Sequence, residues 1–390
     1  MKIEISREEL LSMVNKVSGV IPHAFSTERP LQNTALVEVE DGRVLLHGQG
    51  AEVYARIISK EAQVEGSFPS TCIPVQKKLL PILKQLDKNE PVILEHNGGR
   101  LFLKSGRATF ILSVLPGAQY QKATELPYTH ELKLSRIDFL QGLKRVVFAM
   151  GVGDHRANLN GCNLFINSEG VNLVAADSHR LSKATIAPAP FDEEVSIIIA
   201  SKGVIEIIKV LQGIDDEEVT IRFSNSHLTV QSSHDLVISK LIPARFPDYR
   251  KMLKKTASST CEFQVSAVYE ILRRASILSE QRFLGVLFEL EKDLLSITGK
   301  SVVELDKEKS ITTTEESSDA VTIKYDGEPL EFGINASYVL DALEVMGTEH
   351  TRVELPGVNQ FIVIRPIGEG ASNSMHIISP MRLSSQNAYK

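Results

Sequence analysis

The residues that could carry nucleophilic or acid–base chemistry are few, and their spacing argues against a catalytic site. Asp177, Ser178 and His179 are the three residue types of a hydrolase triad. Adjacent residues of an extended segment point alternately to opposite faces, so these three cannot form one Ser–His–Asp relay. They still support one alternative hypothesis, a hydrolase or transferase that uses His179 and Asp177.

The glycine motifs and the metal-binding residue types are also incomplete. Gly299-Lys300-Ser301 ends like a phosphate-binding loop, but Leu294 stands where that loop needs its first glycine. The paired glycines at 48/50 and 151/153 lack the third glycine of a dinucleotide fingerprint. The ten histidines show no helical metal-ligand pair, and no carboxylates cluster. The sequence therefore predicts no enzyme, no metal and no cofactor.

The elements that must position any site recur three times in the same order. Helix-period segments at 6–19, 135–150 and 266–279 are each followed by a hairpin-like segment, at 36–46, 164–174 and 287–297. A second helix follows, at 72–86, 201–212 and 336–347, and then a second hairpin, at 92–103, 219–230 and 353–364. This pattern predicts an α+β fold of three tandem repeats, each with two helices packed on antiparallel sheets.

The repeats predict the domain boundaries. We expect domains at 1–127, 128–257 and 258–390, the last with a C-terminal tail, because the polar, turn-rich joints fall near 121–133 and 250–262. The third repeat is longer than the others. Its excess lies in the Lys/Glu/Ser/Thr-rich stretch 300–319, which predicts a longer exposed hairpin or loop.

Composition places the chain among globular proteins of a reducing compartment. Its 390 residues are 43% hydrophobic, enough for full cores, and its formal net charge is −6. Cys72, Cys162 and Cys261 are far apart and odd in number, which is typical of a reducing cytosol. The N-terminus does not resemble a signal peptide, and no stretch is long and apolar enough to span a membrane. We therefore expect a cytoplasmic protein without membrane partners.

Charge is segregated by type of element. The six helical segments contain twelve Lys or Arg and seven Asp or Glu, so they are net basic while the rest of the chain is strongly acidic. Scattered Lys and Arg neutralise phosphates without reading bases, which favours sequence-independent DNA contact. The alternative is an ordinary solvated helix face, because lysine is a good helix former.

Several segments resemble one known family. They are LVAADSHRLS (173–182), ARFPDYRKML (244–253), HIISPMRL (376–383), NASYVLDAL (335–343) and RASILSEQRFLGV (274–286). Together with the repeats they resemble the bacterial β sliding clamp, the DNA polymerase III beta subunit and processivity factor of DNA replication, from about residue 1 to Leu383.

The resemblance implies a homodimer closed head-to-tail into a ring that encircles duplex DNA. It implies a non-catalytic subunit of the DNA-directed DNA polymerase holoenzyme, which tethers the replicative polymerase, the clamp loader and repair proteins. Basic side chains of the helices and one loop would face DNA: Lys16, Arg29, Lys77, Lys78, Lys84, Lys144, Arg145, Lys202, Lys209 and Arg273. The remaining alternative is a monomeric peptide-binding scaffold that does not encircle DNA.

The resemblance also implies a pocket for partner peptides that carry a Gln followed by Leu- and Phe-type residues. Its apolar floor and walls would be Leu159, Leu181, Pro247, Met252, Ile377, Pro380 and Met381. Its rim and surroundings would be Arg156, Ala176, Ser178, His179, Arg180, Lys251, Asn335, Tyr338, Ser379 and Arg382. For the apolar residues, simple core packing is the competing interpretation.

The dimer contact implied by the resemblance pairs Phe110 and Leu112 of an edge strand with Ile277 and Leu278 of the third repeat. The chain also departs from the family. Lys251, Met252 and Ala176 replace a common Arg, a smaller aliphatic residue and a frequent Thr, and the tail 384–390 continues past the usual end beside the pocket. These departures bear on peptide preference rather than on the fold.

Overall fold

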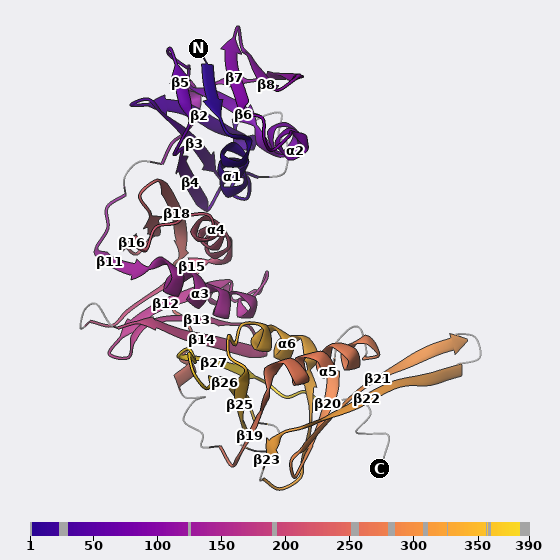
Figure 1. Ribbon diagram of the computed structural model, residues 1–390. Helices are drawn as coiled ribbons and strands as arrows, with labels where there is room; N and C mark the ends of the chain where they lie inside the picture. The colour runs from indigo at the N-terminus through magenta and orange to yellow at the C-terminus, as the bar shows by residue number, and fades with distance from the viewer. Residues whose placement is uncertain are drawn as a thin grey trace. The chain divides into compact units, whose positions relative to one another are not determined.

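The structure is a computed structural model that describes residues 2–22, 30–123, 126–188, 193–250, 257–279, 285–306, 311–325, 327–355, 357 and 360–382. Contacts divide the chain into two compact units, residues 1–140 with 197–243 and residues 141–196 with 244–390. Figure 1 labels the elements in chain order. The second repeat contributes to both units.

The predicted order of helix, hairpin, helix and hairpin occurs three times, which confirms the α+β fold of three repeats. The helices are α1 (Arg7–Ser18), α2 (Leu80–Gln85), α3 (Arg136–Val146), α4 (Ser201–Gln212), α5 (Val265–Ile277) and α6 (Ala336–Glu344). Each predicted hairpin is a pair of antiparallel strands, found within 34–49, 92–105, 161–176, 218–231, 285–306 and 350–367.

One helix differs from its predicted bounds. The segment expected as a helix over 72–86 begins as a strand through Pro74, widens into a π-helical turn at Val75–Leu79, and becomes α-helical at Leu80. Pro81 has no N–H to donate within a helix and is tolerated in the first turn, so the α-helix begins just before it.

In the first repeat the strands are β1 (Lys2–Ile5), β2 (Thr34–Glu40), β3 (Arg43–Gln49), β4 (Val53–Ile58), β5 (Gln63–Glu65), β6 (Thr71–Pro74), β7 (Val92–Asn97), β8 (Arg100–Ser105), β9 (Ala108–Ser113) and β10 (Leu115–Pro116). Asp41 and Gly42 both have positive φ, as a two-residue hairpin turn requires. One sheet has the order β5-β1-β7-β8-β9, which leaves β9 at its edge.

In the second repeat the strands are β11 (His130–Ser135), β12 (Gly161–Asn167), β13 (Gly170–Ala176), β14 (Arg180–Ala187), β15 (Val195–Ala200), β16 (Glu218–Phe223), β17 (His227–Gln231) and β18 (Asp235–Ile242). Within the first unit, β18 pairs with β4 of the first repeat through Val237↔Ala55. A continuous backbone ladder therefore joins these two repeats.

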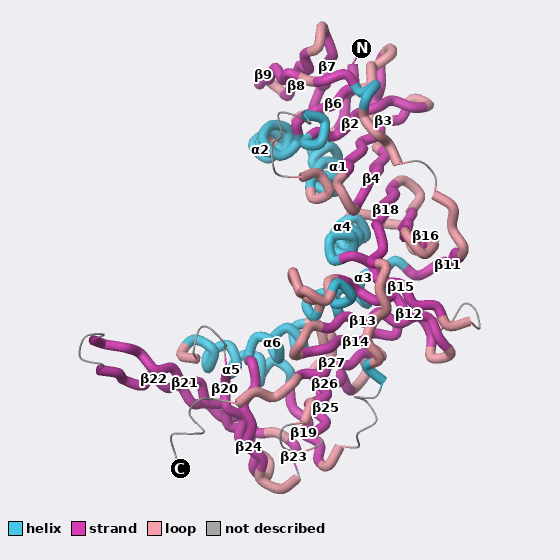
Figure 2. Tube along the Cα trace, turned by 180° about the vertical axis from the view of Figure 1, so that it is seen from behind, coloured by secondary structure: helices cyan, strands magenta, loops and turns pink. Residues whose placement is uncertain are grey.

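In the third repeat the strands are β19 (Ser259–Gln264), β20 (Gly285–Glu291), β21 (Leu294–Asp306), β22 (Ile311–Thr322), β23 (Lys324–Tyr325), β24 (Leu330–Asn335), β25 (His350–Leu355), β26 (Ile362–Ile367) and β27 (Ser374–Ile378). Its core contains Phe263, Leu272, Phe288 and Ile334. Residues 300–306 and 311–319 of the stretch 300–319 lie in the paired strands β21 and β22, which run beyond the other strands of their sheet in Figures 1 and 2. Residues 307–310 lie outside the described residues, and the described part has the paired strands of the predicted hairpin.

Candidate functional site

The pairing of β14 with β27 positions the centre of the candidate site within the second unit. Leu181 lies opposite Ile377, so residues far apart in the sequence become neighbours. After β27 the chain is held at two points. The Ser379 N–H donates to the His179 carbonyl over 2.8 Å, and the Met381 N–H donates to the Gly333 carbonyl over 2.8 Å. The segment 379–381 is thereby fixed between the second and third repeats.

Arg180 connects three elements at this site. Its guanidinium donates to Asp177 over 3.1 Å, to Asp341 of α6 over 2.5 Å and to the Phe148 carbonyl over 2.5 Å. The guanidinium carbon also lies 4.3 Å from the centroid of the Tyr338 ring. A planar fork with several donors suits this combination of ion pairs and ring stacking better than a lysine would.

The ring of Tyr338 forms a second part of the same group. It stacks on His179 with a centroid distance of 6.3 Å and an interplanar angle of 19°. Tyr338 belongs to the first turn of α6, which Asn335 caps by accepting from the Ser337 and Tyr338 N–H groups. The cap therefore sets where the tyrosine lies relative to β14.

Arg156 borders the site from another loop. Its guanidinium donates to both carboxylate oxygens of Asp154, over 3.0 and 2.8 Å, and to the Ser178 hydroxyl over 2.5 Å. The adjacent Arg156 holds the pKa of the Asp154 carboxyl well below its usual range. Asn158 donates to the Arg245 carbonyl over 2.9 Å and so ties this loop to the segment that contains Pro247.

The predicted pocket residues separate into a buried and an exposed group. Leu159, Ala176, Leu181 and Ile377 are buried. Asn335, Tyr338, Arg180, Ser379, Pro380 and Met381 are half-buried, whereas Arg156, Ser178, His179, Pro247 and Arg382 are exposed. Lys251 and Met252 lie outside the described residues, as does the tail 384–390. An apolar floor with a polar rim is the usual arrangement of a site for a short, partly apolar ligand.

Three residues of this site were not predicted from the sequence: Asp154, Phe148 and Asp341. A signal existed for Asp341, because Asn335, Tyr338 and Asp341 follow one another at three-residue spacing and so share one side of a helix. Asp154 and Phe148 contact the site through local loop geometry and through a backbone carbonyl. Sequence spacing gave no indication of either contact.

His376 lies next to this site on β27 and is fully buried. Its Nδ1 is 3.0 Å from the Ser182 hydroxyl, and its ring packs against Phe148. Burial, with a smaller contribution from Arg145, lowers the pKa of His376 to about 3. The imidazole is therefore neutral at physiological pH.

The side chains of Asp177, Ser178 and His179 do not contact one another as a catalytic triad would; each has another partner. The Asp177 carboxylate accepts from the backbone N–H groups of His179 and Arg180 and from the Arg180 side chain. The Ser178 hydroxyl contacts Arg156, and the His179 ring stacks on Tyr338. Asp177 thus organises a turn, and the other two side chains belong to the rim.

The predicted DNA-facing residues differ in their surroundings. Lys77, Lys78, Lys84, Lys202 and Arg273 are exposed, and Lys144, Arg145 and Lys209 are half-buried. Lys202 and Lys209 both pair with the buried Glu206, over 3.1 and 2.9 Å, so α4 carries less net positive charge than its lysines suggest. Arg29 lies outside the described residues.

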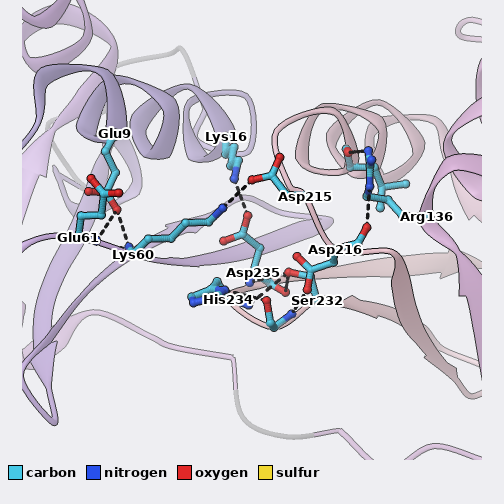
Figure 3. Close-up of polar contacts among 12 residues, drawn as sticks. Glu9, Lys16, Lys60, Glu61, Arg136, Asp215, Asp216, Ser232, His234 and Asp235 are labelled. Carbon is cyan, nitrogen blue, oxygen red and sulfur yellow. Dashed lines mark hydrogen bonds and ion pairs between the residues drawn. The ribbon is translucent and has the colours of Figure 1, made fainter.

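Lys16 corrects one prediction. Its ammonium lies 2.6 Å from Asp235 of β18, and both side chains are almost completely buried. Figure 3 shows this pair beside Lys60, whose ammonium lies 2.9 Å from Asp215. Lys16 therefore joins α1 to the second repeat within the first unit instead of facing DNA. The apolar spacing of the helix cannot reveal this, because the partner is more than two hundred residues away.

The predicted dimer residues lie on β9 and at the end of α5, in different repeats, and they differ in exposure. On β9, Leu112 is buried in its own repeat and Phe110 is half-buried, whereas Ile111 between them is 56% exposed. At the end of α5, Ile277 is 73% exposed and Leu278 is half-buried. Ile111 was not predicted, although strand alternation around Phe110 and Leu112 could have identified it.

Among the described residues, no group of three or more His, Cys, Asp or Glu gathers as a metal site. No helix within the described ranges is long and apolar enough to cross a membrane.

The comparisons with known proteins agree with the three repeats. Models of the N-terminal, central and C-terminal domains of the DNA polymerase III beta subunit match residues 1–124, 133–248 and 250–382. The chain belongs to the DNA polymerase III beta subunit family.

Individual relatives match over their whole length. The "Beta sliding clamp" of Haemophilus influenzae is 29% identical over 98% of this chain and 100% of its own, and that of Escherichia coli K12 is 28% identical with the same coverage. A crystal structure of the Pseudomonas aeruginosa sliding clamp bound to griselimycin is similar with a TM-score of 0.83 and 28% identity, covering 98% of this chain and 100% of that one.

Proposed function

We propose that this protein is a sliding clamp of DNA replication: a ring of two copies that encircles duplex DNA and tethers the replicative polymerase and other DNA-processing proteins. The observation that carries this proposal is the match over the full length of the chain to three beta subunit domains, in the order in which the relatives carry them. The ring confers processivity by topology, and the chain itself catalyses no reaction.

Two open sheet edges support closure of the ring by a second copy. Strand β9 ends the sheet of the first repeat, and β22 ends the sheet β22-β21-β20-β24 of the third. An exposed edge strand invites pairing with another chain. We infer that β9 of one copy meets β22 of the other, with Ile111 and Phe110 near Ile277 and Leu278. Burial of the exposed Ile111 and Ile277 side chains stabilises the ring.

Exposed lysines on α2 and the turn before it support contact with DNA. Lys77, Lys78 and Lys84 are solvent-exposed. Flexible lysines on a helix can neutralise phosphates without contacting base edges, so the attraction is independent of sequence and weakens with salt. Such contacts let an encircling ring move along the duplex.

The site around Arg180 supports recognition of partner peptides. We infer that its apolar residues contact the Leu- and Phe-type side chains of a peptide, and that its rim of His179, Arg180, Tyr338 and Asn335 orients the polar part of the peptide. A tethered polymerase rebinds DNA as an intramolecular event at high effective concentration. A peptide of modest affinity is therefore enough for the replicative polymerase, the clamp loader and repair proteins to use the same site.

The experiment that tests the function compares retention on circular and linear DNA. The protein is loaded onto nicked circular plasmid with a matching clamp loader and ATP, the complex is isolated, and the plasmid is cut once. A clamp stays on the circles and leaves after linearisation. Retention that does not change on cutting and falls steeply with salt would show simple phosphate attraction. A chain that is never retained but binds peptides would be a monomeric scaffold.

A further inference from the structure

The distal half of the β21–β22 hairpin is not needed for the sheet to which it belongs. Strand β21 has 13 residues and β22 has 12, whereas their neighbour β20 has 7. Strand β20 pairs with β21 from Leu294 to Gly299. Beyond Gly299, β21 and β22 pair with each other, through Lys300↔Glu316, Val302↔Thr314 and Glu304↔Thr312. We call the described residues 300–306 and 311–316 the arm.

The arm leaves the third repeat without support from the helix that covers the rest of the hairpin. Helix α5 contacts β21 as far as Gly299, because a Cβ at this position would overlap the Ala275 carbonyl oxygen. It contacts β22 at Ser317, whose hydroxyl lies 3.5 Å from the same oxygen. Arg274 of α5 pairs with Asp319 over 2.6 Å. Figures 1 and 2 show the arm projecting past this helix.

A two-stranded arm of this kind is expected to need a further contact surface for stability. A hairpin of two strands is marginally stable in water, and both outer edges of the arm are open in the described residues. Its sequence also contains Val302, Val303, Leu305 and Ile311, apolar residues that suit a strand packed against another surface. Open edges with such residues are an aggregation hazard unless another surface covers them.

The charges of the arm and of the β8–β9 hairpin indicate which surface the arm contacts. The arm contains the acidic residues Glu304, Asp306, Glu315 and Glu316 and one basic residue, Lys300. The β8–β9 hairpin, residues 100–113, contains Arg100, Lys104 and Arg107 and no acidic side chain. The two hairpins therefore attract each other, and each ends its own sheet with an unpaired strand, β22 or β9.

We propose that the arm of one copy docks on the first repeat of a second copy, along β9 and the segment that follows it. This inference rests on the proposed ring of two copies and extends its interface beyond the edges of the two sheets. Both sheets are antiparallel throughout, and antiparallel pairs predominate in proteins. In antiparallel pairing, the chain that precedes the paired part of β22 lies beside the chain that follows β9.

The segment after β9 offers an apolar surface for the arm. It comprises Val114, β10 and the 3-10 turn Gly117–Gln119. Leu115 is 37% exposed, and Leu115, Pro116, Ala118 and Tyr120 line a cavity of about 750 Å³. Apolar residues of an arm that reached this segment would be removed from water, as would Leu115.

Truncation of the arm tests the proposal. Replacing residues 303–313 by Asn-Gly retains the Val302↔Thr314 pair and closes it with a two-residue turn. Sedimentation equilibrium should show a dimer dissociation constant at least about tenfold higher, a loss of about 1.4 kcal/mol. An unchanged constant overturns the role of the arm while leaving the ring intact. A full chain that is monomeric at every concentration overturns the ring itself.

Two further measurements keep the test independent of the truncated variant. Hydrogen exchange of the unaltered chain should slow on dimerisation in peptides that cover 301–306, 311–316 and 114–121. Equal exchange in monomer and dimer refutes the docking.

A substitution in the segment after β9 gives a second measurement. Leu115→Glu should raise the dimer dissociation constant of the full chain, but it should not raise that of the truncated chain any further. Ile205→Glu, which changes a comparably exposed residue of α4, is the matched control and should leave both constants unchanged.

Discussion

Arg180 determines the geometry of the candidate peptide site. It is bound by two carboxylates and one carbonyl, and it packs on the Tyr338 ring that stacks on His179. The residue holds the Asp177 turn against α6, so the rim depends on it even where a peptide does not touch it. Its contribution is positional, and a change there alters several interactions at once.

We expect Arg180→Ala to weaken binding of a labelled Gln/Leu/Phe-type peptide by about tenfold or more, about 1.4 kcal/mol, because Tyr338 and His179 lose their support. Fluorescence anisotropy measures the affinity. Arg352→Ala is the matched control, since Arg352 makes a comparable two-contact ion pair with Glu262 away from this site. Equal affinities of the two variants would remove Arg180 from the site.

His376 makes stability depend on pH. Its folded pKa of about 3 lies below the unfolded value of about 6.5. As pH falls below about 6.5, His376 becomes protonated in the unfolded chain but stays neutral in the folded chain. The free energy of unfolding therefore declines between about pH 6.5 and pH 3, and His376 does not affect it above pH 6.5. His47, buried with a pKa of about 4, acts in the same direction.

We therefore expect His376→Gln to be less stable at neutral pH but to lose less stability between about pH 6.5 and 4.5 than the original chain. Urea unfolding midpoints across this range measure the slope. Val152→Ala, which changes a 98% exposed side chain without a titrating group, should leave the slope unchanged. A slope that is the same in all three proteins would contradict the burial argument.

At the scale of elements, buried charge joins α1 to β18. The side chains of Lys16 and Asp235 have relative exposures of 9% and 2%, and the ladder between β4 and β18 runs beside them. A buried ion pair stabilises the folded state little more than an apolar pair of similar size. A buried charge without its partner, however, lowers the free energy of unfolding by several kcal/mol. The pair therefore favours one arrangement of the first and second repeats within the first unit.

We expect Lys16→Met to lower the free energy of unfolding by about 3–5 kcal/mol, because the Asp235 carboxylate loses its partner. The double variant Lys16→Met/Asp235→Leu should recover most of this loss, since no charge then remains buried. Urea denaturation of both variants measures the difference. Lys60→Met is the control for the exposed pair with Asp215 and should cost less than about 1 kcal/mol.

At the scale of the whole molecule, retention on DNA and attraction to DNA are separate properties. Retention comes from closure of the ring, whereas attraction comes from the exposed lysines near DNA phosphates. Replacing Lys77, Lys78 and Lys84 by Gln should reduce the salt dependence of binding to a short linear duplex. The log–log slope should fall by about one for each phosphate that is no longer neutralised. Anisotropy titrations at several salt concentrations measure this slope.

The same triple variant should still be retained on closed circles once loaded. The matched control replaces Lys133, Lys240 and Lys292, which are exposed on strands or in a turn, and should keep the original slope. If the two triple variants behave alike, α2 and the turn before it do not contribute a DNA-facing surface.

Several features of the fold followed from local patterns. Helical spacing around Leu10, Val14 and Val17, and the Asp41-Gly42 turn, predicted α1 and the first hairpin because both depend on neighbouring residues. Pro81 also explains locally why α2 begins at Leu80 and not at the start of the predicted helix 72–86. The length and polar composition of the stretch 300–319 indicated an addition to the third repeat, and its described residues 300–306 and 311–319 form paired strands.

The repeats, the types of their elements and the segments that resemble the clamp family could all be predicted from the amino-acid sequence, because these are properties of short windows of chain. Three contacts became known only from the folded chain: Lys16 buried against Asp235, Asp341 bound to Arg180, and the strand pairing that sets Leu181 opposite Ile377, two residues that the family resemblance had only grouped in one pocket. Each of them joins residues more than 150 positions apart. Burial and long-range pairing set the energy of a charged side chain, and neither is encoded in its neighbours along the chain.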